Sequence, residues 1–182
     1  MPRLFTGLEL PPGVREALAS QRGGLPGARF LEPDLYHLTL RFLGDVDRPT
    51  AEDFLECLAE ARPRFGLPVV LDALDGFGGD RPRSLIVRAR ADDALLDLQA
   101  EHERIARRAG MPPETRRFTP HVTLARLGRG VSAGAVAGWL AERAPFAPLT
   151  FTASRAVLFS ARDGTGGGPY LVEADFPFGD EA

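Results

Sequence analysis

The chain has 182 residues, which is enough for one hydrophobic core or for two small lobes. All 22 basic residues are arginine, and the absence of lysine excludes a Schiff base, a lysyl-nucleotide intermediate and a P-loop lysine. Because the net charge is −3, the protein does not coat nucleic acid through bulk charge, and a local cluster of arginines must hold any polyanion. The single cysteine, Cys57, excludes an internal disulfide and a cysteine-based zinc site.

The apolar residues are spread along the chain and are not gathered in one run. No stretch reaches the roughly 18 apolar residues that a transmembrane helix needs. The first residues also lack the long apolar core of a signal peptide. We therefore expect a cytoplasmic, monomeric protein that does not enter a membrane.

Strands and helices alternate along the predicted structure. β-favouring runs bounded by Gly and Pro predict strands at Leu4–Leu10, Leu35–Leu43, Val69–Leu74, Ser84–Arg90, Phe118–Leu127, Leu149–Phe159 and Tyr170–Phe176. Helical spacing predicts helices at Val14–Ser20, from an N-cap at Thr50 to about Arg62, from a cap at Asp92 or Asp93 to Ala109, and from Ser132 to about Arg143. The first half reads as a strand, a helix, a strand, a helix and two strands, and the second half repeats this order if the long helix from Asp92 or Asp93 is taken as its opening. No flexible linker separates the halves. We predict an α+β fold whose two lobes form one domain over residues 1–182.

Two of the three histidines lie in nearly identical sequences, His37-Leu38-Thr39-Leu40 and His121-Val122-Thr123-Leu124. Average residue frequencies make this motif a chance event of about one in a thousand per histidine. Its presence once in each half of the chain therefore indicates a shared function.

The spacing of the motif predicts a polar face on each strand. Side chains alternate along a strand, so His37 and Thr39 share one face, as do His121 and Thr123. If the halves pack with approximate two-fold symmetry, two imidazoles and two hydroxyls converge on one cleft. An imidazole has a pKa of about 6.5, so one can accept a proton while the other donates one. In-line displacement at phosphorus needs both transfers, and the hydroxyls can donate hydrogen bonds to phosphate oxygens.

Other chemistries lack such a pattern. His102 lies in a polar helical segment without the second histidine of a zinc HExxH site, so we expect it on a solvated face and expect no catalytic metal. The run Gly164–Gly168 is not followed by a helix, which predicts a hairpin loop and not a dinucleotide site. No GxSxG motif is present and Cys57 has no partner histidine, so catalysis by a nucleophilic Ser or Cys is not expected.

The residues around the two motifs resemble one branch of the two-histidine (2H) phosphoesterases. This branch contains the RNA 2′,3′-cyclic phosphodiesterases, historically called 2′-5′ RNA ligases. The similarity covers nearly the whole chain and is carried by Arg3-Leu4-Phe5, Leu8–Pro11, His37–Gly44, Phe118–Arg126 and Gly168-Pro169-Tyr170.

The resemblance implies a bilobal fold, with an antiparallel sheet and flanking helices in each of two pseudo-symmetric lobes around a central cleft. It implies hydrolysis of RNA 2′,3′-cyclic phosphate ends to 2′-phosphomonoesters, without a cofactor or metal. His37 would then donate a proton to O3′ and His121 would accept one from water, although the near-symmetric motifs alone do not distinguish these roles. Thr39 and Thr123 would bind the phosphate.

Two arginines are further candidates for phosphate binding. Arg126 matches the family's second motif, but strict alternation places it opposite His121 unless a bulge intervenes. Arg41 is in phase with His37 and is favoured by alternation.

Ligation without ATP, as the reverse of a transesterification, is a possible second reaction, although the high concentration of water favours hydrolysis. Two alternatives stay open: a phosphodiesterase for small cyclic nucleotides or ADP-ribose cyclic phosphate, and a non-catalytic RNA- or nucleotide-binding module. Comparing mononucleotide with oligonucleotide substrates separates the first alternative from the RNA enzyme. Replacing the histidines tests the second, because in a binding module they would only hold phosphate and their loss would weaken binding.

Overall fold

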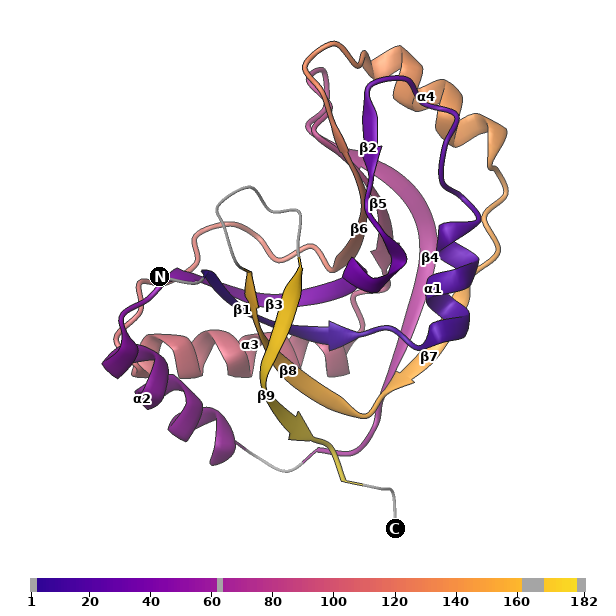
Figure 1. Ribbon diagram of the computed structural model, residues 1–182. Helices are drawn as coiled ribbons and strands as arrows, with labels where there is room; N and C mark the ends of the chain where they lie inside the picture. Colours follow the sequence, from indigo (N-terminus) through magenta and orange to yellow (C-terminus); the bar gives the residue numbers. More distant parts are fainter. Residues whose placement is uncertain (1–2, 62–63, 162–168, 180–182) are drawn as a thin grey trace.

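The computed structural model describes residues 3–61, 64–161 and 169–179 (Figure 1). Within these ranges nine strands form one antiparallel sheet: β1 (Arg3–Glu9), β2 (Ala28–Phe30), β3 (His37–Asp45), β4 (Leu67–Phe77), β5 (Ser84–Ala89), β6 (His121–Leu127), β7 (Leu149–Ala153), β8 (Arg155–Ala161) and β9 (Tyr170–Pro177). They are connected by α1 (Pro12–Ala19), a 3₁₀ turn η1 (Pro33–Leu35), α2 (Arg48–Ala59), α3 (Asp93–Arg108) and α4 (Ala133–Glu142). No helix among the described residues is both long and apolar enough to cross a membrane.

The strands follow the order β7-β4-β5-β6-β3-β1-β8-β9, with β2 paired to β6, and they divide into two lobes. The β6 lobe contains β7, β4, β5, β6 and β2 with α1 and α4, and the β3 lobe contains β3, β1, β8 and β9 with α2 and α3 (Figure 1). Leu18 of α1 and Trp139 of α4 are buried in the apolar core of the β6 lobe. Phe54 of α2 and Ile105 of α3 belong to a second core, against Leu158 of β8. The expected α+β class is confirmed.

The chain crosses between the two lobes several times, and two of the places where they meet bear on the site. Strands β3 and β6 pair antiparallel through Leu38 and Val122. Strands β7 and β8 are separated only by Ser154, so the chain passes directly from the edge of the β6 lobe into the β3 lobe (Figure 1). The predicted strand Leu149–Phe159 is thus two strands that belong to different lobes.

The helix ends match the sequence signals in part. The Asp92 carboxylate accepts a hydrogen bond from the Leu95 N–H at 2.9 Å, as the predicted cap of α3, and Gly110 follows that helix with a φ of +88°. Helix α2 begins earlier than predicted, because Asp47 and not Thr50 is its N-cap and accepts from the Thr50 N–H at 2.9 Å. Pro49 favours this start, since a proline fits the first turn, where no N–H partner is needed.

The strands also differ in detail from the prediction. The strand expected from Leu35 begins at His37, because Pro33–Leu35 forms the η1 turn, and the strand expected from Phe118 begins at His121 after Pro120. The short strand β2 is not signalled by any alternating pattern. The loop predicted at Gly164–Gly168 and the predicted helix end at Arg62 lie outside the described residues.

Candidate active site

The two His-x-Thr motifs meet where the lobes join. Leu38 pairs with Val122, and these residues occupy the same position in their motifs. The strands run antiparallel, so the residue before one partner lies beside the residue after the other. This register sets His37 across from Thr123 and Thr39 across from His121.

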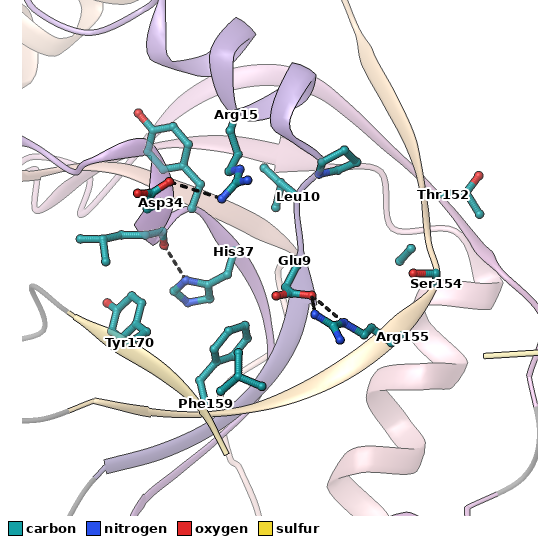
Figure 2. Close-up of a pocket in the computed structure, with 15 residues that line it drawn as sticks. Glu9, Leu10, Arg15, Asp34, His37, Thr152, Ser154, Arg155, Phe159 and Tyr170 are labelled. Atoms are coloured by element: carbon teal, nitrogen blue, oxygen red, sulfur yellow. Dashed lines mark hydrogen bonds and ion pairs between the residues drawn. The ribbon is translucent and has the colours of Figure 1, made fainter. Parts of the chain in front are cut away.

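Both histidines are held by the backbone in the same way. The Nδ1 atom of His37 lies 2.8 Å from the Leu35 carbonyl oxygen, and that of His121 lies 2.7 Å from the Thr119 carbonyl oxygen (Figure 2 shows the first). A carbonyl oxygen only accepts, so each Nδ1 carries the hydrogen and donates it. The Nε2 atom of each ring is therefore the one that can exchange a proton with a ligand.

His37 lies in an aromatic enclosure. Its ring centre is 4.8 Å from that of Phe5, 5.1 Å from Tyr170 and 5.7 Å from Phe159. Its Nε2 lies 3.1 Å from the Thr39 hydroxyl oxygen. Burial lowers the pKa of His37 to about 4, against the opposing effect of the carbonyl that accepts from Nδ1, and positive charge from the second histidine and Arg126 lowers it further.

His121 has a different surrounding. The edge of its ring meets Phe77 at a centre distance of 4.6 Å, and the Arg88 guanidinium lies 5.5 Å from the Phe77 ring centre. Arg88 is also ion-paired to Asp75 at 2.5 Å. Burial is the main cause that lowers the pKa of His121, and the nearby Arg126 and Arg88 charges add to it. Both imidazoles are therefore biased toward the neutral form when no anion is bound.

A β-bulge follows each motif at the same position. In β3, Thr39 pairs with Gly7 and Arg41 with Thr6, so that Leu40 is the additional residue. In β6, Thr123 pairs with Ile86 and Ala125 with Leu85, so that Leu124 is the additional residue. Each bulge shifts the alternation of side chains by one residue.

The bulges decide where the two candidate arginines lie. The phase expected for Arg41, beside His37, is wrong: its side chain is 7% exposed, and it donates from Nε to Glu103 at 2.5 Å and from Nη2 to the Pro112 carbonyl at 2.7 Å. In β6, by contrast, the bulge places Arg126 on the face of the strand that carries His121, and its positive charge lowers the pKa of both imidazoles. The predicted role of Arg126 in phosphate binding required such a bulge.

A further arginine, Arg29, lies at the site without having been predicted. It stands directly opposite Arg126 in the pairing of β2 with β6, and both side chains are exposed. Neither has an ion pair with another residue in the part of the chain that the structure describes. Burial raises the pKa of Tyr170, while Arg126 and Arg29 both oppose that shift, so the tyrosine lies near this pair of charges.

Two hollows flank the motifs. The hollow beside His37 has a volume of about 430 Å³, and Glu9, Arg15, Asp34, Arg155, Phe159 and Tyr170 are among the residues that line it (Figure 2). The hollow beside His121 has a volume of about 380 Å³ and is lined by Thr39, Phe42, Phe77, Arg116, Arg117 and Phe118, among others. We call these the His37 hollow and the His121 hollow.

The third histidine lies behind the sheet. The expectation of a solvated face is wrong for His102, which is 2% exposed and has its Nδ1 2.9 Å from the Thr6 hydroxyl oxygen. Helical spacing places it with Leu95, Leu98 and Ile105 on the buried stripe of α3. Among the described residues, no group of three or more His, Cys, Asp or Glu side chains is placed to hold a metal ion.

Two imidazoles anchored at Nδ1, each across from a threonine and close to an exposed arginine, define a phosphoesterase of the two-histidine class. The chain belongs to the LigT-like phosphoesterase family, whose pattern matches it twice, over residues 8–87 and 86–170. The two matches follow the two halves and place one His-x-Thr motif in each.

Relatives and solved structures agree with this assignment. A protein of Aeropyrum pernix named RNA 2′,3′-cyclic phosphodiesterase is 38% identical over 120 residues, or 63% of this chain, and the chain spans 64% of that relative's length. A Bacillus subtilis protein of the same name is 29% identical over 71% of this chain and 73% of its own. A Thermus thermophilus structure superposes with a TM-score of 0.79 at 26% identity, covering 99% of this chain and 100% of that chain. E. coli LigT complexed with 3′-AMP shares the fold, with a TM-score of 0.75, 21% identity, and coverage of 98% and 99%.

Proposed function

We propose that this protein hydrolyses RNA 2′,3′-cyclic phosphate ends to 2′-phosphomonoesters. The observation that carries the proposal is the pair of imidazoles, His37 and His121, each with Nδ1 bonded to a carbonyl oxygen, so that Nε2 is the nitrogen for proton transfer. Family membership and the names of the curated relatives support the substrate class.

The reaction uses one histidine as base and the other as acid. Nε2 of His121 accepts a proton from water as the water oxygen attacks phosphorus, and Nε2 of His37 donates a proton to O3′ as the P–O3′ bond breaks. The phosphate remains on O2′. Because the two imidazoles supply both proton transfers, the proposed chemistry needs no metal ion.

Substrate binding prepares His37 for its role as acid. Its pKa of about 4 leaves the ring neutral at neutral pH when the cleft holds no anion. A bound phosphodiester brings a negative charge close to the ring, which favours the protonated form and raises that pKa. The charge of Arg126 and the hydroxyls of Thr39 and Thr123 hold the non-bridging oxygens in the transition state.

The same arrangement supports ligation without ATP. An RNA 5′-hydroxyl takes the place of water, His121 accepts its proton, and O3′ leaves with a proton from His37, so that a 2′-5′ phosphodiester forms. No lysine and no nucleotide cofactor enter this step. Water is far more concentrated than any 5′-end, so hydrolysis dominates.

The test uses a short RNA with a 2′,3′-cyclic phosphate end, incubated with the protein in EDTA, and phosphorus NMR to locate the product phosphate. We expect a 2′-phosphate from the wild type. His37→Ala and His121→Ala should each lower kcat by roughly a thousandfold, because each removes one proton transfer. His102→Gln, a histidine change outside the cleft, is the matched control and should retain turnover.

Three results would contradict the proposal: a 3′-phosphate product, turnover that survives in both variants, or turnover that appears only when a metal ion is added. A wild type that binds the RNA end without converting it would favour a binding module.

A further inference from the structure

The two hollows beside the motifs differ in charge. In the His37 hollow, Arg15 lies 3.5 Å from Asp34 and Arg155 lies 2.8 Å from Glu9, so each lining arginine has an acidic partner (Figure 2). The described residues that line the His121 hollow include three arginines but only one carboxylate, that of Glu114. Among the lining residues, the excess of positive charge therefore lies in the His121 hollow, in addition to the charges of Arg126 and Arg29 near Tyr170.

One arginine of the His121 hollow is not neutralised. Arg41 is paired with Glu103 at 2.5 Å, and Arg116 is paired with Glu114 at 3.1 Å. Arg117 is exposed and has no ion pair with any other residue within residues 3–61, 64–161 and 169–179. Its guanidinium is the charge in this hollow that is available to a phosphate oxygen.

The same hollow presents aromatic surface. Phe42 is 45% exposed, because the bulge in β3 turns it to the face that carries His37 and Thr39. Phe77 and Phe118 line the same hollow and are each half-buried. Exposed aromatic rings beside an exposed arginine are typical of surfaces on which nucleic-acid bases stack.

We propose that the His121 hollow binds the nucleotide that precedes the terminal 2′,3′-cyclic phosphate residue of RNA. Arg117 holds the phosphodiester between these two nucleotides, and the base of the preceding nucleotide stacks on Phe42. This inference rests on the proposed function and gives the bound RNA a direction. The chain runs over the His121 hollow, and the terminal nucleoside occupies the charge-balanced His37 hollow.

The arrangement makes an oligonucleotide a better substrate than a mononucleotide. A nucleoside 2′,3′-cyclic phosphate reaches the two histidines but leaves the His121 hollow empty. A dinucleotide with the same end adds one phosphodiester and one stacked base. We therefore expect a lower KM and a roughly tenfold or larger gain in kcat/KM for the dinucleotide.

Four substrates separate the two contacts: a nucleoside 2′,3′-cyclic phosphate, the same compound with a 5′-phosphate, an abasic-ribose dinucleotide and a normal dinucleotide. Arg117→Gln should raise KM roughly tenfold for the three that carry the additional phosphate, with little change for the first. Phe42→Leu should raise KM for the normal dinucleotide alone. Arg108→Gln removes an exposed arginine at the end of α3 and is the matched charge control, with no expected effect.

Salt dependence is the second readout. Loss of one phosphate contact should reduce the slope of log KM against log salt for the dinucleotide by about 0.7. Equal kcat/KM for mononucleotide and dinucleotide, or an Arg117→Gln effect of the same size on all four substrates, would overturn the subsite. Failure of the wild type to hydrolyse any of the four would instead overturn the proposed function, and the subsite with it.

Discussion

Leu38 of β3 pairs with Val122 of β6, and each is the residue between histidine and threonine in its own motif. The two motifs are therefore related by an approximate two-fold axis that passes between Leu38 and Val122, at the centre of the site. Each histidine therefore lies across from the threonine of the other motif, and it also lies two residues before the threonine of its own motif. In the proposed reaction, a phosphate bound here would meet hydroxyls and imidazoles from both halves of the chain.

The pH dependence should respond to Arg126. Its charge lowers the pKa of both His37 and His121, in addition to the larger effect of burial. Arg126→Gln removes that repulsion, so both pKa values should rise. The base then becomes protonated at a higher pH and the acid keeps its proton to a higher pH, which moves both limbs of the kcat/KM profile upward.

NMR titration of the two imidazoles in Arg126→Gln and in the control Arg108→Gln checks this prediction directly. A fall in either pKa, or an equal shift in both variants, would contradict it. The loss of a phosphate contact should also lower kcat roughly a hundredfold.

Arg41 should act on stability and not on chemistry. Its side chain and that of Glu103 are largely buried, and removing one partner leaves a charge without compensation. We expect Arg41→Met to lower the free energy of unfolding by about 2–4 kcal/mol. The double variant Arg41→Met/Glu103→Leu should recover much of this loss. Urea unfolding measures both, and a double variant less stable than the single one would contradict the prediction.

Arg29 should contribute to binding at a small cost in stability. Like charges at directly opposed positions, as in the Arg29–Arg126 pair, destabilise a sheet by a few tenths of a kcal/mol. Arg29→Gln should therefore raise the melting temperature slightly while raising KM for the cyclic phosphate roughly fivefold. Steady-state kinetics and calorimetry on one preparation test both effects. An unchanged KM would remove Arg29 from the site.

His102 should make the fold sensitive to acid. Burial is the main cause that lowers its pKa to about 4 in the folded protein, whereas an exposed imidazole in the unfolded chain titrates near 6.5. Between these values the unfolded state binds more protons, so stability is full above about pH 6.5 and falls as the pH drops toward 4. His102→Gln, which can still bond to Thr6, should weaken this fall by about 2–3 kcal/mol. Unfolding midpoints at pH 7 and pH 4.5 measure the difference, and equal pH dependence in both proteins would contradict it.

The site could be predicted from the sequence as far as alternation within one strand allows. His37 and Thr39 share a face as predicted, and their Nε2 and Oγ1 atoms are 3.1 Å apart. The bulges that exchange the places of Arg41 and Arg126 arise from pairing with β1 and β5. A bulge depends on the register between neighbouring strands, and the pattern of a single strand does not contain it.

Two other differences have separate physical reasons. The buried stripe of α3 includes His102 at helical spacing from Leu98 and Ile105. In the sequence, however, His102 stands between two glutamates, which favours a solvent-exposed side chain. Arg29 lies on a strand of three residues, which is too short for any period to be read. Its place opposite Arg126 follows from tertiary pairing alone.

The single residue Ser154 between β7 and β8 has a mechanical consequence. Like the pairing of Leu38 with Val122, it is a place where the lobes meet directly, with one residue between β7 of one lobe and β8 of the other. Ser154 also lines the His37 hollow, so this tether runs along the cleft itself. The segment that joins the lobes is therefore also part of the wall of the cleft, so a substitution at Ser154 acts on the fold and on the site together.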